Sequence, residues 1–178
     1  MLRVLFVGRF QPPHLGHIHV LSWCLGFADE VVVVIGSAQE SYTLKNPFTV
    51  SERLEMLRCA VREAGLPLAA FRFVPLQDIN MNPVWPRYLE TMVPRFHLVV
   101  TGNRLVAELF RDYGYPVAEP PFYRREVCSG TRIRSLMVSG DESWRSLVPA
   151  CVASYIDGID GVGRLRRIYG CSGGGGTA

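Results

Sequence analysis

The sequence predicts an α/β fold: an open, mostly parallel five-stranded sheet with helices on both faces and a helical C-terminal part. Two observations predict it. Between residues 2 and 119, five short apolar or β-branched runs alternate with segments of helical periodicity, which is typical of a parallel sheet with crossover helices. After its first residue, the run EVVVVI contains only apolar residues and does not alternate with polar ones, as expected for a strand that is buried on both faces. Beyond residue 130 the pattern is helical only.

The strands are expected at residues 2–7, 30–35, 71–76, 98–101 and 116–119. Helices are expected between them at 18–27, 50–64, 83–92 and 104–113, and after them at 131–138, 143–147, 149–156 and 162–168. The second helix has the clearest boundaries, because TVSE at 49–52 spells a capping box and Gly65 follows as a stop. Asn82 is expected to cap the third helix, with Pro83 at its first position. Parallel strands bring the loops that follow them to one edge, where ligands of such sheets bind.

Length and composition indicate one globular domain over residues 1–170, since 48% of the 178 residues are hydrophobic. Residues 171–178 are rich in glycine and are expected to be a disordered tail. The longest apolar run is far too short to span a bilayer, and the N-terminus lacks a signal-peptide layout, so we expect a cytoplasmic protein without membrane contact. The net charge of +3 suits a small anionic substrate and gives no reason to expect nucleic acid.

The five cysteines are odd in number and include no CxxC pair. Cys24 and Cys59 fall on apolar faces of expected helices, so we interpret them as small core residues. The sequence therefore supports neither a disulfide framework nor a catalytic thiol. Cys128 differs from the others because it borders a candidate phosphate-binding turn.

The most specific signal is the segment GRFQPPHLGH at residues 8–17, between the first strand and the first helix. Such a turn presents free backbone N–H groups and the positive end of a helix dipole, which bind phosphate. His14 and His17 lie three residues apart at the helix start and can face the same anion. The segment lacks both the ending of a P-loop and the three glycines of a dinucleotide fingerprint. A zinc site would need further ligands at matching spacing, and a structural role would explain one histidine but not the pair.

A second candidate is SGTRIR at residues 129–134, at the start of an expected helix. The hydroxyls of Ser129 and Thr131 can hold the β- and γ-phosphates of a nucleotide, and Arg134, one turn later, can neutralise a leaving pyrophosphate. The plain alternatives are N-capping for the hydroxyl residues and a solvated helix face for the arginine. The first motif, in the correct chain order, favours the phosphate interpretation.

The first segment resembles the ATP-binding motif of the nucleotidyltransferase superfamily, whose core is HxGH, and SGTRIR resembles its second motif. The segments GSAQES at 36–41, NPFT at 46–49 and QDIxxNxxW at 77–85 are similar to archaeal-type nicotinamide-nucleotide adenylyltransferases, and the likeness spans about residues 2–167. This resemblance implies a Rossmann-like fold and the synthesis of NAD and pyrophosphate from ATP and nicotinamide mononucleotide (NMN). It also implies a homo-oligomer, often a hexamer.

Such a transfer needs no nucleophile from the protein, because a phosphate oxygen of the acceptor attacks the α-phosphorus of ATP in line. The protein has to hold the phosphates and spread their charge. We expect Mg²⁺ as the cofactor, bound with ATP and carried by its phosphates, because the sequence offers no Asp/Glu cluster as a metal site of the protein.

The expected site residues follow from these motifs. The catalytic residues are expected to be His14, His17, Arg9, Arg134 and Lys45. The residues expected to contact ATP are Gly8, Phe10, Gln11, Gly16, Gly102, Asn103, Ser129, Gly130 and Thr131. Those expected to contact NMN are Ser37, Asp78, Asn82 and Trp85. The indole can stack on the cationic nicotinamide ring and the Asn82 amide can pair with its carboxamide, while the plain alternative for the tryptophan is a core position.

Two positions depart from the family pattern, and other activities stay open. Lys45 stands where relatives often carry arginine, so it keeps the charge without the bidentate geometry, and Pro13 replaces a residue that is often aromatic. The acceptor can instead be FMN or phosphopantetheine, or the donor CTP, although QDIxxNxxW favours nicotinamide. A non-catalytic nucleotide sensor on the same fold is opposed by the intact histidines and Arg134.

Overall fold

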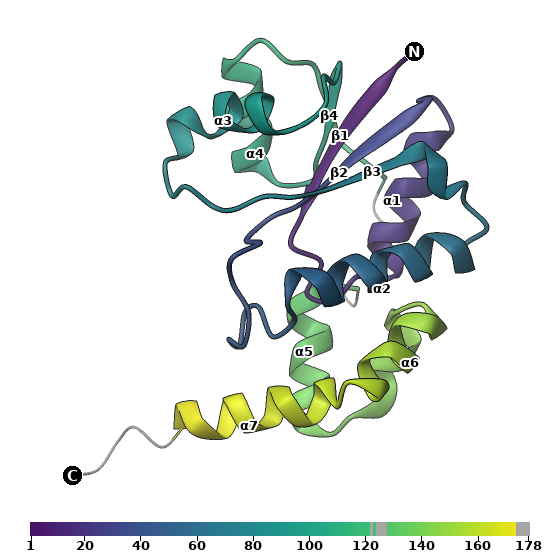
Figure 1. Cartoon of the computed structure of the whole chain (residues 1–178), viewed down its shortest axis with the longest axis vertical. Helices are drawn as coiled ribbons and strands as arrows, with labels where there is room; N and C mark the ends of the chain where they lie inside the picture. Colours follow the sequence, from purple (N-terminus) through teal and green to yellow (C-terminus); the bar gives the residue numbers. More distant parts are fainter. Residues whose placement is uncertain (122, 124–127, 174–178) are drawn as a thin grey trace. The chain divides into compact units, whose positions relative to one another are not determined.

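Figure 1 shows the chain as a computed structural model, which describes residues 1–121, 123 and 128–173. The chain divides into two compact units. Unit 1 comprises residues 1–9, 19–39 and 67–122, and unit 2 comprises residues 10–18, 40–66 and 123–178. Each unit combines three separate segments of the chain, and the single domain expected over residues 1–170 stays a prediction.

Unit 1 is built on a five-stranded sheet of β1 (Arg3–Gly8), β2 (Glu30–Ile35), β3 (Phe71–Pro75), β4 (Leu98–Val100) and β5 (Val117–Ala118). The strand order is β3-β2-β1-β4-β5, and every neighbouring pair is parallel. These observations confirm the predicted α/β fold with an open parallel sheet. The order reverses between β1 and β4, which is where ligands bind in sheets of this kind.

Residues on both faces of the sheet are buried. On one face, Leu5 and Val32 pack with Leu89 of α3 (Trp85–Met92) and Phe110 of α4 (Arg104–Asp112). The alternate residues of the strands, such as Val31, point to the other face and are also buried. Figure 1 shows α1 (Leu15–Leu25) on that second side. All six residues of β2 are buried, as its apolar sequence predicts.

Unit 2 is mainly helical. Its helices are α2 (Val50–Glu63), α5 (Gly130–Ser139), α6 (Ala150–Gly158) and α7 (Gly161–Gly173), with the 3₁₀ segment η3 (Glu142–Leu147). α2 packs against α6, and α7 packs against both α5 and α6. Gly161 begins α7 where a side chain has no room, because a Cβ there would lie 2.9 Å from the Phe48 ring. The predicted helical C-terminal part is confirmed.

Most helix boundaries follow the expected capping chemistry. Thr49 and Glu52 form the predicted capping box of α2, and Gly65 beyond its end has a left-handed φ of 68°. The predicted cap at Asn82 is wrong. Residues Asn82–Val84 form a 3₁₀ segment, η2, and the carbonyl of Asn82 accepts the Trp85 N–H three residues later. A second 3₁₀ segment, η1 (Leu68–Ala70), precedes β3.

One prediction about the cysteines is also wrong. Cys59 in α2 and Cys151 in α6 form a disulfide, with Cα atoms 6.1 Å apart and a sequence separation of 92. No spacing rule signals this pair, because only the packing of α2 against α6 brings the two sulfurs together. Cys24 is a buried thiol in the core, as predicted.

The C-terminal end differs from expectation over three residues. α7 continues to Gly173 and so includes residues 171–173 of the predicted tail. The rest of that segment, residues 174–178, lies outside the described residues, and its expected disorder stays a prediction.

Candidate active site

A pocket of about 300 Å³ opens at the carboxyl edge of the sheet in unit 1. The loops after β1, β2, β3 and β4 all contribute to it, as expected for loops that share one edge of a parallel sheet. Six of the predicted site residues line this pocket: Gly8, Arg9, Ser37, Asp78, Trp85 and Asn103. Asn82 and Gly102, the other predicted residues of unit 1, do not line it.

Asp78 is held in place by the loop that follows β2. The Ser37 hydroxyl donates to Oδ2 of Asp78 at 2.6 Å, and the Ser37 N–H donates to Oδ1 at 3.3 Å. The Asp78 N–H in turn donates to Oε1 of Gln39 at 3.1 Å. Ser37 has a left-handed backbone with φ 49°, which is uncommon outside glycine and is typical of functional loops. The pocket therefore contains a carboxylate whose orientation is set before any ligand binds.

Trp85 belongs to the pocket and to the core at the same time. Its ring packs edge-to-face on Phe110, with centroids 5.5 Å apart, and it also lines the pocket. The two interpretations of this residue are thus compatible. Asn82 is exposed at the start of η2, and its predicted contact with NMN stays a prediction. Asn103 caps α4 by accepting the Leu105 N–H at 3.0 Å.

In unit 2, His14 and His17 lie side by side at the start of α1, with stacked rings whose centroids are 3.6 Å apart. The backbone N–H of His14 donates to Nδ1 of His17 at 3.2 Å. The Phe10 ring packs on His17 at 4.6 Å between centroids. Because Nδ1 of His17 accepts a hydrogen bond, the proton of its neutral ring lies on Nε2.

Both histidines are neutral near pH 7. Burial lowers the pKa of His14 to about 4. Burial, together with the neighbouring His14, holds the pKa of His17 well below its usual range. A neutral imidazole that carries its proton on Nε2 can donate to a phosphate oxygen without adding a buried charge. The pair is therefore suited to hydrogen bonding rather than to charge neutralisation.

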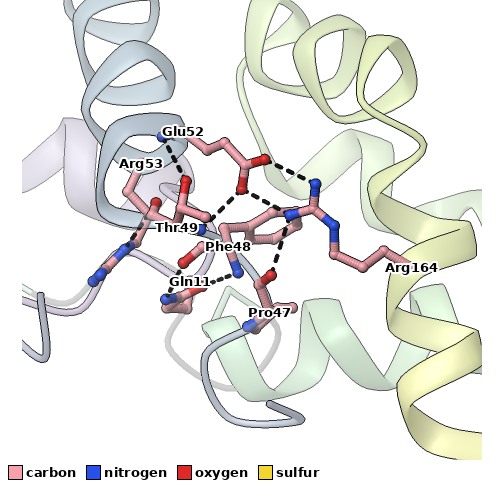
Figure 2. Close-up of polar contacts among 7 residues, drawn as sticks. All are labelled: Gln11, Pro47, Phe48, Thr49, Glu52, Arg53 and Arg164. Atoms are coloured by element: carbon pink, nitrogen blue, oxygen red, sulfur yellow. Dashed lines mark hydrogen bonds and ion pairs between the residues drawn. The ribbon is translucent and has the colours of Figure 1, made fainter. Parts of the chain in front are cut away.

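Gln11 connects the histidine loop, residues 10–17, to the segment before α2 through two hydrogen bonds (Figure 2). Its Nε2 donates to the Phe48 carbonyl at 2.9 Å, and its Oε1 accepts the Phe48 N–H at 3.0 Å. The side chain is 3% exposed, and both ends of its amide are used by the protein. Its observed role is to position the loop, and its contact with ATP stays a prediction.

Ser129 and Gly130 begin α5 in the way the second motif predicts. The Ser129 hydroxyl accepts the Arg132 N–H at 3.3 Å, so the capping role is present. A Cβ at Gly130 would lie 3.2 Å from the Gln11 carbonyl oxygen, which leaves little room for a side chain. The motif therefore lies directly against the histidine loop.

Arg134 does not lie on a solvated helix face. Its Nη1 donates to the Gln11 carbonyl at 2.8 Å and its Nε donates to the Leu44 carbonyl at 3.0 Å. Its Nη2 lies 3.4 Å from the Thr131 hydroxyl. The guanidinium thus connects the two motifs to each other and to the loop that carries Lys45.

A groove of about 650 Å³ runs along α5 and α7 in unit 2. Three predicted site residues line it together, namely Lys45, Thr131 and Arg134, and α7 contributes Leu165 and Tyr169. Two cationic side chains and a hydroxyl at one groove suit the binding of phosphate groups.

Within the part of the chain that the structure describes, no group of three or more His, Cys, Asp or Glu side chains is placed to hold a metal ion. The groups that these motifs offer to a bound nucleotide are imidazole, guanidinium, ammonium and hydroxyl. No helix among the described residues is long and apolar enough to cross a membrane.

Comparison with known proteins identifies the family. Residues 5–136 match the cytidylyltransferase-like family. Over 168 residues the chain is 54% identical to a protein of Pyrococcus abyssi named nicotinamide-nucleotide adenylyltransferase, which covers 94% of this chain and 89% of that protein. The chain belongs to the nicotinamide-nucleotide adenylyltransferase family. A protein of the same name from Aeropyrum pernix is 50% identical to this chain. The match covers 94% of this chain and 98% of the Aeropyrum protein.

A solved structure supports the fold of this adenylyltransferase family member. A bifunctional NMN adenylyltransferase/ADP-ribose pyrophosphatase from Francisella tularensis, complexed with AMP and a manganese ion, superposes with a TM-score of 0.75 at 22% identity. The match covers 93% of this chain and 52% of that protein, so the chain spans about half of its length.

Among the residues that sequence reasoning missed are Thr101, which lines the pocket of this adenylyltransferase family member, and Gln39, which contacts Asp78. Thr101 is 4% exposed, lines the pocket and accepts the Asn103 N–H on its hydroxyl at 3.1 Å. Its position at the end of a predicted strand was a usable signal. Gln39 accepts the Asp78 N–H, and its only signal was its place in the GSAQES segment, which lies in a polar loop.

Proposed function

We propose that the chain transfers the adenylyl group of ATP to the phosphate of NMN, forming NAD and pyrophosphate by direct in-line attack without a covalent intermediate. The observation that carries the proposal is the stacked pair of neutral imidazoles at the start of α1, in a chain of the adenylyltransferase family. Donors that are fixed before the reaction stabilise developing charge without reorganising.

In this proposal, the Nε2–H groups of His14 and His17 donate to the α- and β-phosphates of ATP. Thr131 and Lys45 bind the β- and γ-phosphates at the groove of unit 2, and Arg134 keeps the two motifs together while it faces the leaving pyrophosphate. No side chain has to act as a nucleophile, since the acceptor supplies its own oxygen.

The pocket of unit 1 supplies the nicotinamide site. Trp85 offers an aromatic face to the cationic ring, and Asp78 offers a fixed acceptor for a hydroxyl or amide of the ligand. Arg9, at the end of the pocket that follows β1, is suited to the phosphate of NMN.

Mg²⁺ is proposed to arrive with ATP. When bound, it would neutralise charge on the phosphate oxygens, and in this proposal the phosphates themselves carry it. We further propose a cytoplasmic homo-oligomer that has no nucleic-acid partner.

The test is a pyrophosphate-release assay with ATP or CTP as donor and NMN, FMN or phosphopantetheine as acceptor. We expect pyrophosphate and NAD in equal amounts from ATP and NMN, with kcat/KM at least 100-fold lower for the other pairs. Faster release with FMN or phosphopantetheine would reassign the acceptor. Tight ATP binding without release for any acceptor would support the sensor alternative.

A further inference from the structure

Cys128 lies directly before the second motif and touches the histidine loop in unit 2. Its side chain is 6% exposed, and its sulfur is a thiol rather than part of a disulfide. The Gly16 N–H donates to Sγ at 3.3 Å, Nδ1 of His14 lies 3.5 Å from Sγ, and the Leu147 carbonyl lies 3.6 Å from it. One buried sulfur thus contacts three separate segments of unit 2.

The protons at this sulfur can be counted. A thiol has one hydrogen and accepts weakly, so the Gly16 N–H occupies its acceptor side. The S–H lies within reach of both the Leu147 carbonyl and Nδ1 of His14. If it donates to Nδ1, the neutral ring of His14 carries its proton on Nε2. If it does not, Nδ1 of His14 can itself be the protonated nitrogen, and Nε2 can then only accept.

When the Cys128 thiol donates to Nδ1 of His14, both histidines carry an N–H donor on Nε2. The contact of His17 with the His14 N–H already places the proton of His17 on Nε2. A phosphate oxygen accepts hydrogen bonds and has no hydrogen to give at neutral pH, so both rings need Nε2–H to bind it.

We propose that Cys128 is a positioning residue, whose thiol donates to Nδ1 of His14 and so holds His14 in the tautomer that can donate from Nε2 to the triphosphate. Its consequence for the rate rests on the proposed function, whereas its effect on the tautomer does not. The His14 ring is closely packed on this side, since a Cβ at Gly16 would lie 3.1 Å from its Nδ1.

The test uses the full chain, labelled with ¹⁵N-histidine, and reads the tautomer of His14 near pH 7 from long-range ¹H–¹⁵N spectra. The His14→Gln variant identifies the signals. We expect the Nε2–H form in the wild type and in Cys128→Ser, whose hydroxyl can still donate. In Cys128→Ala we expect a mixture of tautomers.

The kinetic arm compares the same proteins. We expect kcat to fall roughly 10- to 100-fold in Cys128→Ala, with KM for ATP changed less than about 3-fold, and we expect Cys128→Ser to recover most of the rate. A purely structural cysteine would instead lower stability without changing the tautomer.

An Nδ1–H form of His14 in the wild type would overturn the proposal, as would an unchanged tautomer in Cys128→Ala. If Cys128→Ala does not fold, the tautomer of the wild type still decides, because Nδ1–H there excludes a thiol donor. If no acceptor supports pyrophosphate release while the tautomer responds as expected, the proposed function fails and the positioning role of Cys128 stands.

Discussion

The guanidinium of Arg164 in α7 holds both carboxylate oxygens of Glu52 in the first turn of α2. Nη1 lies 2.8 Å from Oε2, and Nη2 lies 2.8 Å from Oε1. The same guanidinium lies over the Tyr42 ring at 4.6 Å and donates to the Pro47 carbonyl at 3.3 Å. Glu52 also accepts the Thr49 N–H of the capping box (Figure 2). One cation of the C-terminal helix therefore contacts both sides of the loop that carries Lys45.

Replacing Arg164 should destabilise the protein. Both side chains of the pair are largely buried, at 13% and 15% exposure, so Arg164→Gln leaves the Glu52 carboxylate without its charged partner. We expect the free energy of unfolding to fall by about 3 kcal/mol in urea titrations. The matched control is Arg167→Gln on the same helix. Arg167 pairs with Asp160 at the surface, and we expect a much smaller change there. Equal losses in the two variants would contradict the prediction.

His17 should matter for the rate more than for ATP affinity. In His17→Asn, the side-chain oxygen can replace Nδ1 as acceptor for the His14 N–H, but the Nε2–H donor is lost. We expect kcat to fall about 100-fold and the Kd for ATP to change less than about 5-fold. His17→Gln places an amide N–H near Nε2 and should recover part of the rate. An unchanged kcat in His17→Asn would remove this donor from the mechanism.

Trp85 should select between the two substrates. Trp85→Ala removes the aromatic face of the unit 1 pocket, and we expect the Kd for NMN to rise at least 10-fold in calorimetric titrations while the Kd for ATP stays within about 2-fold. Trp85→Phe keeps an aromatic ring next to Phe110 and serves as the control for lost core packing. Equal weakening of both ligands by Trp85→Ala would assign Trp85 to the core alone.

The disulfide should contribute to stability in a redox-dependent way. Cys59→Ser opens a loop of 92 residues in the unfolded chain, for which the chain-entropy description gives a loss of about 3 to 5 kcal/mol. Dithiothreitol should lower the urea midpoint of the wild type toward that of Cys59→Ser and leave the variant unchanged. A wild-type midpoint that does not respond to the reductant would contradict the prediction.

Acid should destabilise the protein partly through His14. Burial lowers its pKa to about 4 in the folded state, against about 6.5 for an unfolded chain. Between these values the unfolded chain binds a proton that the folded chain does not. The contribution is therefore fully present above about pH 6.5 and is lost as the pH falls toward about 4. The difference corresponds to about 3 kcal/mol.

This acid effect can be measured by urea unfolding at about pH 7 and about pH 4.5. His14→Gln has no titrating ring, so its stability should fall less than that of the wild type between the two conditions. Parallel losses in both proteins would show that other groups account for the acid sensitivity.

The elements that the sequence predicted well are those with local causes. The β-branched run of β2 and the TVSE capping box of α2 were recognisable because their chemistry lies within a few neighbouring residues. The error at Asn82 has the same origin. A local cap signal was overridden by the 3₁₀ turn in which the Asn82 carbonyl accepts the Trp85 N–H.

The alternation of strands and helices, the two phosphate motifs and the likeness to the adenylyltransferases are all recognisable in the sequence, because each depends on contiguous residues. Which distant groups meet depends on how the chain packs. Gln11 hydrogen-bonds Phe48 at a sequence separation of 37. Cys128 contacts His14 at a separation of 114, and Arg164 pairs with Glu52 at a separation of 112. The spacing of residues in the sequence does not predict such pairs. They form when buried surfaces pack together, because the polar groups buried between those surfaces need hydrogen-bond partners.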